Sequence, residues 1–466
     1  MKILLVNPSQ NAVYGKKVII PPAYPPLGLL YIAAMIEKGN NVEILDFDTD
    51  DLTKEKFISH LNKFNPDLVG LTASTPMIKN ALKAAEWVKE NRDVPVVLGG
   101  IHATIAPEEC ISNENIDFIL KGEAEKTFEE FVKNFSSRKF KGIKGIWYKE
   151  NGKVIRNPDR ELIKNLDELP FPARHLMKHP EKYIPADALR QPVTTIITTR
   201  GCPGKCTYCC TKNIFGSYVR FRSIDNVMKE IKECIDGFGI KEFHIMDDCF
   251  TISKRLVMDF RDAIKKSGMD INFVFPNGLR ADHVDRDVLT ALKDLGVISV
   301  GYGVESGNQQ ILDNIKKGIT LKQVRDAFKL SKELGFETWG FFMLGLPGEN
   351  KNTARDTINF AKELDPDFAK FLILKPYPGS EIYEQLEKSD LILDHDYDKY
   401  GVYTGAIHKL PDLSQEEISR LQKKAFREFY LRPKKIIQHI KRIRSFTQLK
   451  LNAKSAVFIL KRMVFN

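Results

Sequence analysis

The run TRGCPGKCTYC at residues 199–209 places Cys202, Cys206 and Cys209 at the spacing C-x3-C-x2-C. Three thiolates on one short loop can bind three irons of a [4Fe–4S] cluster, and no fourth cysteine stands at a cluster spacing. The fourth iron would stay open, which indicates catalysis, because electron-transfer clusters usually have four thiolates. The alternative is a zinc knuckle, but structural zinc typically uses two separated pairs of ligands, and Cys210 directly follows Cys209.

Outward from this loop, residues 191–390 alternate apolar strand-like segments with helical stretches. Six such units predict a partial β/α (TIM-like) barrel, and the cysteine loop follows the first of its strands. In barrels of this kind the chemistry lies on the loops after the strands. The expected strands are Thr194–Thr198, Glu242–Met246, Asn272–Phe275, Ile298–Gly301, Thr338–Leu344 and Phe368–Leu374.

Residues 1–135 contain a separate alternation of five short apolar strands with helices. It predicts an α/β domain with a doubly wound parallel sheet, whose ligands bind outside the carboxyl ends of the strands. Residues 136–190 are expected to form a linker with a hairpin turning at Asn151-Gly152. Residues 391–466 are expected to be mostly helical. The expected strands of the first domain are Lys2–Val6, Val42–Leu45, Leu68–Leu71, Val94–Leu98 and Phe118–Leu120.

The excess positive charge is confined to a basic tail, Arg432–Asn466. This tail contains ten of the 71 Lys and Arg and no Asp or Glu, so the other 61 basic residues balance the 61 acidic ones and the net charge is +10. With its interleaved isoleucines, the tail is a solvated helical face, a segment for anionic lipid or a segment for RNA.

The seven cysteines do not form a disulfide-like framework, and the N-terminus does not have signal-peptide architecture. No apolar run approaches the ~20 residues of a membrane-spanning helix. We therefore expect a cytoplasmic protein, peripheral on the inner face of the membrane if the tail binds lipid.

The cysteine loop, with Tyr208 directly before its third cysteine, resembles that of the radical S-adenosylmethionine (SAM) superfamily. The N-terminal domain resembles the cobalamin-binding domain fused to many of these enzymes, and the whole resemblance covers roughly residues 1–390. It implies three cofactors: a [4Fe–4S] cluster on the three cysteines, SAM chelated to the open iron, and cobalamin. The stretches that match the cobalamin-binding domain are Pro25–Leu29, Ser74-Thr75, Gly99–His102 and Gly122–Glu125.

The resemblance also implies roles for residues that follow the barrel strands. Asp247 and Asp248 replace the more common Gly-Gly-Glu and would accept hydrogen bonds from the SAM amino group. Arg280 would meet the SAM carboxylate. The remaining expected SAM contacts are Tyr208 near the adenine, Glu305 and Ser306 at the ribose, and Gly345 and Leu346 at the adenine.

For cobalamin, the resemblance implies contacts from small and polar residues after the N-terminal strands. The motif D-x-H-x-x-G, whose histidine ligates cobalt in some relatives, does not occur in the sequence. We therefore expect cobalamin to bind base-off without a protein histidine, with His102 the less favoured candidate ligand. The expected contact residues are Ser74, Thr75, Gly99, Gly100, His102, Gly122 and Glu123.

These implications favour a cobalamin-dependent C-methyltransferase that acts on an unactivated carbon of a small-molecule or lipid-like, hydrophobic substrate. An external donor of the flavodoxin or ferredoxin type would reduce the cluster. The alternatives are a radical cyclase or oxidoreductase without methyl transfer, an RNA-modifying radical SAM enzyme and a non-catalytic cobalamin sensor. We expect no nucleic-acid partner, because a separate RNA-binding domain is lacking.

Overall fold

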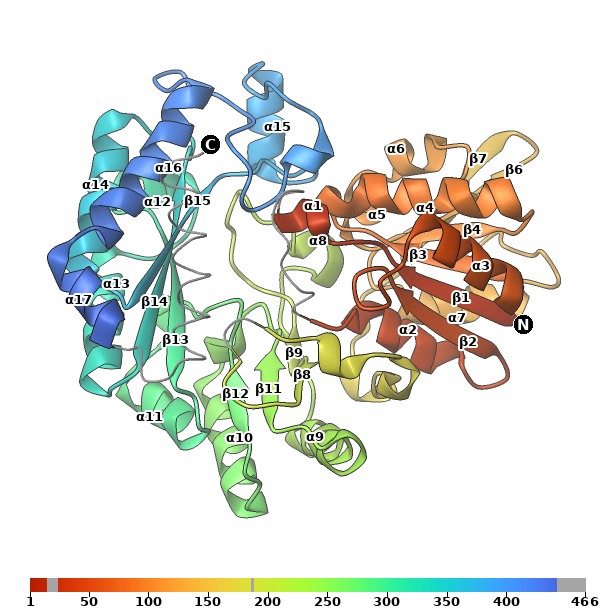
Figure 1. The fold of residues 1–466 in the computed structure, drawn as a ribbon, viewed down its shortest axis with the longest axis horizontal. Helices are drawn as coiled ribbons and strands as arrows, with labels where there is room; N and C mark the ends of the chain where they lie inside the picture. The colour runs from red at the N-terminus through yellow and green to blue at the C-terminus, as the bar shows by residue number, and fades with distance from the viewer. Residues whose placement is uncertain (15–23, 186–187, 442–466) are drawn as a thin grey trace.

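The computed structural model describes residues 1–14, 24–185 and 188–441 (Figure 1). An N-terminal sheet with helices on both faces lies beside a partial barrel, and C-terminal helices cover the far side of that barrel. This arrangement confirms the predicted α/β class, with a parallel-sheet domain followed by a partial β/α barrel.

The N-terminal sheet has the strand order β2-β1-β3-β4-β5-β6-β7, and its first five strands are parallel. Helices α3 and α4 pack on one face, while α2 and α7 pack on the other. Both faces are therefore apolar, as in buried parallel sheets. The bounds are β1 Lys2–Asn7, β2 Asn41–Asp46, β3 Leu68–Thr72, β4 Val96–Gly99, β5 Phe118–Leu120, α1 Asn11–Tyr14, α2 Leu27–Ile36, α3 Lys54–Phe64, α4 Ile78–Asn91, α5 Ile101–Ile105, α6 Pro107–Ser112 and α7 Glu125–Asn134.

The hairpin expected within the linker is an edge of this sheet. Its strands, β6 (Ile146–Glu150) and β7 (Lys153–Arg156), add antiparallel to β5. Tyr148 of β6 packs against the rings of Phe118 and Phe140. This aromatic contact fixes the hairpin to the N-terminal domain instead of leaving it between the domains.

The partial barrel consists of two three-stranded parallel sheets, β12-β11-β8 and β13-β14-β15. An isolated bridge between Leu279 and Tyr302 connects them. The strands are β8 Val193–Ile196, β11 Glu242–Ile245, β12 Asn272–Val274, β13 Ser299–Glu305, β14 Glu337–Leu344 and β15 Phe368–Ile373. The surrounding helices are α9 Ile224–Phe238, α10 Lys254–Ser267, α11 Arg286–Asp294, α12 Gln309–Asn314, α13 Leu321–Glu333, α14 Lys351–Leu364 and α15 Glu381–Lys388.

The C-terminal helix α16 (Gln415–Tyr430) begins with the predicted capping box, in which Ser414 and Glu417 each bond the other's backbone N–H. Its buried face packs on β15 through ring contacts of Phe426 and Phe429 with Phe371. Among the residues that the structure describes, no helix is both long and apolar enough to cross a membrane.

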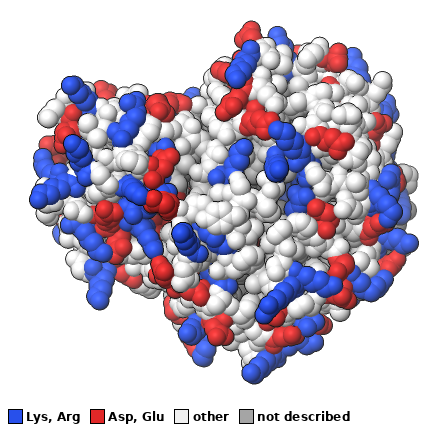
Figure 2. All heavy atoms as spheres, turned by 180° about the vertical axis from the view of Figure 1, so that it is seen from behind, with Lys and Arg blue, Asp and Glu red and all other residues white. Residues whose placement is uncertain are grey.

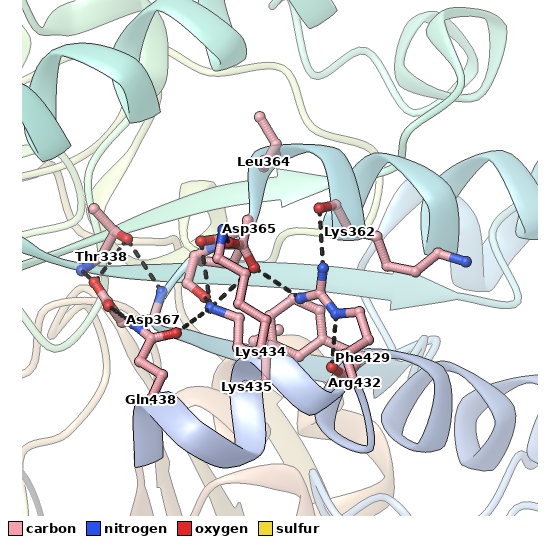
Figure 3. A network of polar contacts seen from close by, with 12 residues as sticks. Thr338, Lys362, Leu364, Asp365, Asp367, Phe429, Arg432, Lys434, Lys435 and Gln438 are labelled. Atoms are coloured by element: carbon pink, nitrogen blue, oxygen red, sulfur yellow. Dashed lines mark hydrogen bonds and ion pairs between the residues drawn. The ribbon is translucent and has the colours of Figure 1, made fainter. Parts of the chain in front are cut away.

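The basic tail starts with a helix that is docked on the barrel, α17 (Pro433–Lys441). Asp365 forms ion pairs with Arg432, Lys434 and Lys435 at distances of 2.8, 2.8 and 3.0 Å (Figure 3). Three of the ten tail cations are therefore held by the body of the protein. The rest of the tail, residues 442–466, lies outside the described residues.

Candidate active site

The cysteine loop follows β8 and the short strand β9 (Thr199–Arg200), at the carboxyl end of the barrel strands. All three cysteines are half-buried. A Cβ atom placed on Gly204 would lie 3.3 Å from Sγ of Cys202 and 3.9 Å from Sγ of Cys206. The two sulfurs therefore lie close to a backbone segment without a side chain. Within residues 1–14, 24–185 and 188–441, no three Cys, His, Asp or Glu side chains already converge on one metal position.

The neighbouring Cys210 is turned away from these sulfurs. Its thiol donates a hydrogen bond to the carbonyl oxygen of Pro378 at 3.6 Å. Cys210 is therefore engaged with the surrounding structure, and the assignment of Cys202, Cys206 and Cys209 as the cluster ligands stays a prediction.

Tyr208 and Glu305, predicted as SAM contacts from different strands, meet in the structure. The Tyr208 hydroxyl donates to Oε1 of Glu305 at 3.1 Å, and Nζ of Lys317 donates to the same oxygen at 2.6 Å. Burial is the main cause that raises the pKa of Tyr208. Lys317 was not predicted, because it lies outside every recognised motif and reaches the site through the loop after α12.

Arg280 lies beside the cysteine loop. A Cβ on Gly204 would be 3.6 Å from one of its guanidinium nitrogens. The guanidinium also donates two hydrogen bonds to Asp282, at 3.0 and 2.9 Å, which fix its orientation. A fixed cation next to the open side of the loop suits the carboxylate of a zwitterionic ligand.

The two adjacent aspartates have different surroundings. Asp247 is buried and accepts hydrogen bonds from the backbone N–H of Thr198 at 2.7 Å and from the hydroxyls of Thr198 and Thr199. Burial raises its pKa to about 6. Asp248 is half-buried and lies next to the loop, where it accepts from the N–H of Gly201 and from Thr211, each at 3.3 Å. The carboxylate of Asp247 thus connects the segment after β11 to Thr198 and Thr199, while Asp248 contacts the start of the cysteine loop. The role of both aspartates as acceptors for the SAM amino group stays a prediction.

The three other expected SAM contacts lie in buried or hydrogen-bonded surroundings, and their roles toward SAM stay predictions. Ser306 is fully buried, and its hydroxyl forms a hydrogen bond with that of Thr357 in α14 at 3.1 Å. The N–H of Gly345 donates to Glu349 at 2.6 Å, and its carbonyl accepts from His408 at 2.8 Å. Leu346 is fully buried in the barrel core.

A cavity of about 210 Å³ lies between the two domains. On the N-terminal side its lining includes Gly28, Gly70, Gly99, Gly100 and Gly122, and on the barrel side Ile197, Arg200, Ile214 and Phe215. Gly100 has φ +94°, and a Cβ there would lie 2.7 Å from the carbonyl oxygen of Ala73. A cavity lined by so many glycines lets a large ligand approach the backbone closely, as cobalamin would require.

The remaining expected cobalamin contacts lie beside this cavity, outside its lining. Thr75 bonds through its hydroxyl to Nδ1 of His102 at 3.2 Å, and Ser74 directly precedes it. His102 is fully buried, and its ring packs edge-on against Tyr397 with centroids 4.8 Å apart. Burial lowers the pKa of His102 to about 4, so the ring is neutral at physiological pH.

A buried ion-pair network, which was not predicted, joins the cavity to the cysteine loop. Arg200 donates to Glu123 at 2.9 Å and to Glu125 at 2.6 Å, and Arg220 donates to Glu123 at 2.7 Å. Both oxygens of Glu123 are thereby engaged, so this expected cobalamin contact also fastens the N-terminal domain to the barrel. Arg200 directly precedes Gly201 and lies near the rings of Tyr31 and Phe215.

Comparison with known proteins agrees with this geometry. Residues 196–361 match the model of the Radical SAM superfamily, and residues 20–132 match that of the B12 binding domain. An uncharacterized methyltransferase of Pyrococcus horikoshii is 39% identical over 94% of this chain and 95% of its own length. Cytidylyl-2-hydroxyethylphosphonate methyltransferase of Streptomyces wedmorensis is 30% identical over 92% of this chain and 90% of its own.

Among solved structures, the cobalamin-dependent S-adenosylmethionine radical enzyme OxsB, with aqua-cobalamin and S-adenosylmethionine bound, shares the fold. Its TM-score is 0.77, with 18% sequence identity over 99% of this chain and 71% of that chain.

Proposed function

Since the chain belongs to the family of B12-binding radical SAM enzymes, we propose that it methylates an unactivated carbon of a hydrophobic or lipid-like substrate. The observation that carries the proposal is the position of Arg200. Its side chain lines the glycine-rich cavity, and its backbone leads directly into the cysteine loop. Arg200 thus connects the cavity proposed for cobalamin to the loop proposed for the cluster and SAM.

The residues present fit three cofactors. Cys202, Cys206 and Cys209 would hold a [4Fe–4S] cluster, and the glycine-lined cavity would hold cobalamin. When bound, these groups and SAM supply the radical and methyl-transfer chemistry, for which an external donor provides the electron. Asp248 and Arg280 would bind the charged end of SAM, and Tyr208 and Glu305, fixed by Lys317, its nucleoside.

The inner face of the second half-barrel supports a hydrophobic substrate. Along β14, buried residues such as Phe342 and Leu344 pack in the helix-covered core, so the alternate residues Trp339 and Phe341 face the barrel interior. Trp339 stacks on Phe368 of β15 with centroids 4.3 Å apart. These half-buried aromatic rings offer apolar surface to a ligand, with Nζ of Lys370 lying 5.2 Å from the ring centroids of Trp339 and Phe341.

The test is anaerobic reconstitution of the full chain with iron, sulfide, SAM and cobalamin, followed by incubation with small-molecule and lipid extracts. Mass analysis should detect a product heavier by one CH2 whose added carbon comes from the SAM methyl group. If SAM is cleaved and a product forms without added carbon, the result contradicts methylation. It would support the cyclase or oxidoreductase alternative.

We predict that cobalamin binds with its base displaced from cobalt and without a histidine ligand. His102→Ala should leave the absorption spectrum of the bound cofactor unchanged, because His102 is buried against Tyr397 and Thr75. Gly100→Ala, by contrast, should reduce cobalamin retention on gel filtration, because its Cβ would meet the Ala73 carbonyl oxygen. A spectrum of imidazole-ligated cobalt that is lost in His102→Ala would contradict the prediction.

For the basic tail we propose reversible docking on an anionic membrane, which would bring the barrel to an apolar substrate. Ile436 and Ile437 of α17 are 43% and 52% exposed, and seven tail cations lie beyond the three that pair with Asp365. Figure 2 shows acidic and basic side chains intermixed on one face of the body, consistent with its balanced charge. Apolar area combined with cations is what stable surface binding requires.

We predict that the full chain co-sediments with liposomes that contain anionic lipid at low salt and is released as salt increases, because exposed charges are screened. A chain that ends at Lys441 keeps the ion pairs with Asp365 and should remain in the supernatant. If both versions remain in the supernatant, the tail is a solvated segment. Release from liposomes by added RNA would favour the nucleic-acid alternative.

A further inference from the structure

A bridging segment of the C-terminal region, residues 396–402, contacts both the barrel and the N-terminal domain. On the barrel side, Nζ of Lys375 donates a hydrogen bond to the carbonyl oxygen of Lys399 at 3.0 Å. The hydroxyl of Tyr377 donates to the carbonyl oxygen of Tyr400, also at 3.0 Å. Both donors lie on the loop after β15, so the bridging segment is fixed to the barrel through its backbone.

Tyr397 of the bridging segment makes two contacts with the N-terminal domain. Its hydroxyl donates a hydrogen bond to Oε2 of Glu109 at 2.8 Å, and its ring packs edge-on against that of His102, with centroids 4.8 Å apart. The backbone N–H of Val402 donates a further hydrogen bond to the carbonyl oxygen of Val13 at 2.9 Å. The segment therefore reaches helices α1, α5 and α6, which follow the carboxyl ends of β1 and β4.

The turn after β4 connects His102 to the glycine-lined cavity. Gly100 lines that cavity, and two residues later the backbone N–H of His102 donates to the carbonyl oxygen of Ala73 at 3.1 Å. The imidazole of His102 is fully buried, and its Nδ1 lies 3.2 Å from the hydroxyl oxygen of Thr75. Its Nε2 has no hydrogen-bond partner among the described residues, so packing against Tyr397 contributes to holding the imidazole in place.

We propose that Tyr397 is a positioning residue for cobalamin, which acts through His102 to hold the Gly100 turn in the conformation that binds the cofactor. The proposal rests on the proposed function, which places cobalamin in the glycine-lined cavity. Tyr397 lies outside residues 20–132 and 196–361, which match the two family models, so the match to those models does not assign it a role. The cobalamin site would thus extend into the C-terminal region.

The expected effect follows from the population of the binding conformation. Loss of the Tyr397 ring would remove packing from a buried imidazole, and the turn would then occupy other conformations part of the time. If the binding conformation falls to about one tenth of the molecules, the apparent dissociation constant rises about tenfold. Tyr397→Phe keeps the ring against His102 and loses only the hydrogen bond to Glu109, so it should bind with close to wild-type affinity.

The test is equilibrium dialysis of the full chain, with its cluster reconstituted, against hydroxocobalamin. Tyr397→Ala and His102→Ala should each raise the dissociation constant about tenfold. The double variant should bind about as weakly as either single variant, because the two residues act as one unit. The matched control is Lys79→Ala, which removes a surface ion pair of 2.5 Å with Asp396 of the same segment and should bind like the wild type.

Iron content and the far-ultraviolet circular dichroism of each variant report whether the cluster and the fold are retained. Equal dissociation constants in the wild type and Tyr397→Ala would overturn the proposal, as would losses that multiply in the double variant. An equal loss in Lys79→Ala would also overturn it, since docking of the whole segment would then control binding.

Two outcomes need separate treatment. If Tyr397→Ala does not fold, His102→Ala removes the same contact from the other side, and wild-type affinity in that variant would overturn the proposal. A wild type that binds no hydroxocobalamin, with an intact cluster, would contradict the proposed function and this proposal with it.

Discussion

Replacement of any one of Cys202, Cys206 or Cys209 by alanine is expected to abolish SAM cleavage. A [4Fe–4S] cluster on this loop has three protein thiolates, and removal of one leaves too few ligands to hold it. Anaerobically reconstituted wild type should contain about four irons per chain, as that cluster type requires. Each variant should lose most of this iron, measured together with release of 5′-deoxyadenosine.

The control variants replace cysteines that are not expected to bind the cluster. Cys210 bonds to a carbonyl oxygen, and Cys234 is buried in α9, so alanine at either position should leave the iron content and SAM cleavage close to wild type. The half-buried loop cysteines lie outside the apolar cores, so their variants should keep the wild-type circular dichroism spectrum. Stoichiometric zinc without sulfide in the wild type would contradict the cluster.

The second large effect is expected at the junction of the domains. Arg200→Ala would leave the buried carboxylates of Glu123 and Glu125 without their shared partner, and Arg220 reaches only Glu123. Removal of one member of a buried ion pair typically costs about 3–5 kcal/mol. We therefore expect a clear fall in the urea midpoint and in the melting temperature of the full chain.

A matched control for this variant is Arg190→Ala, because Arg190 also forms a two-point ion pair, with Asp270, but at the surface. Its unfolding should be close to that of the wild type. Adding Glu125→Gln to Arg200→Ala should recover part of the lost stability, because one uncompensated charge is removed. A melting temperature for Arg200→Ala equal to that of Arg190→Ala would show that the buried network does not hold the domains together.

The fold was predictable because the sequence patterns that determine it involve residues close together in the chain. Alternating apolar segments predicted the strands of both domains, and the cysteine spacing placed the cluster ligands on one loop after β8. The side-chain partners were not predictable in this way. The contact between Tyr208 and Glu305 spans 97 residues, and that between Arg200 and Glu123 spans 77. Only the tertiary packing of segments far apart in the sequence decides such pairs.

The same reason explains the differences at individual site residues. Sequence position put Asp247 and Asp248 together after β11, but the donors that each carboxylate meets come from other segments and could not be read from the sequence. Asp247 found three donors in Thr198 and Thr199. Ser306 similarly turned toward α14, where Thr357 offered a partner.

The division of the barrel into two half-sheets has a mechanical consequence. The cysteine loop, Asp248 and Arg280 belong to the half built on β8, β11 and β12, whereas Glu305 ends β13 and Lys317 follows α12 in the other half. Across the seam, the strands meet at the bridge between Leu279 and Tyr302. A ligand that contacts Tyr208 and Glu305 together would connect the two half-sheets. Binding of such a ligand would therefore reduce the motion of one half-sheet relative to the other.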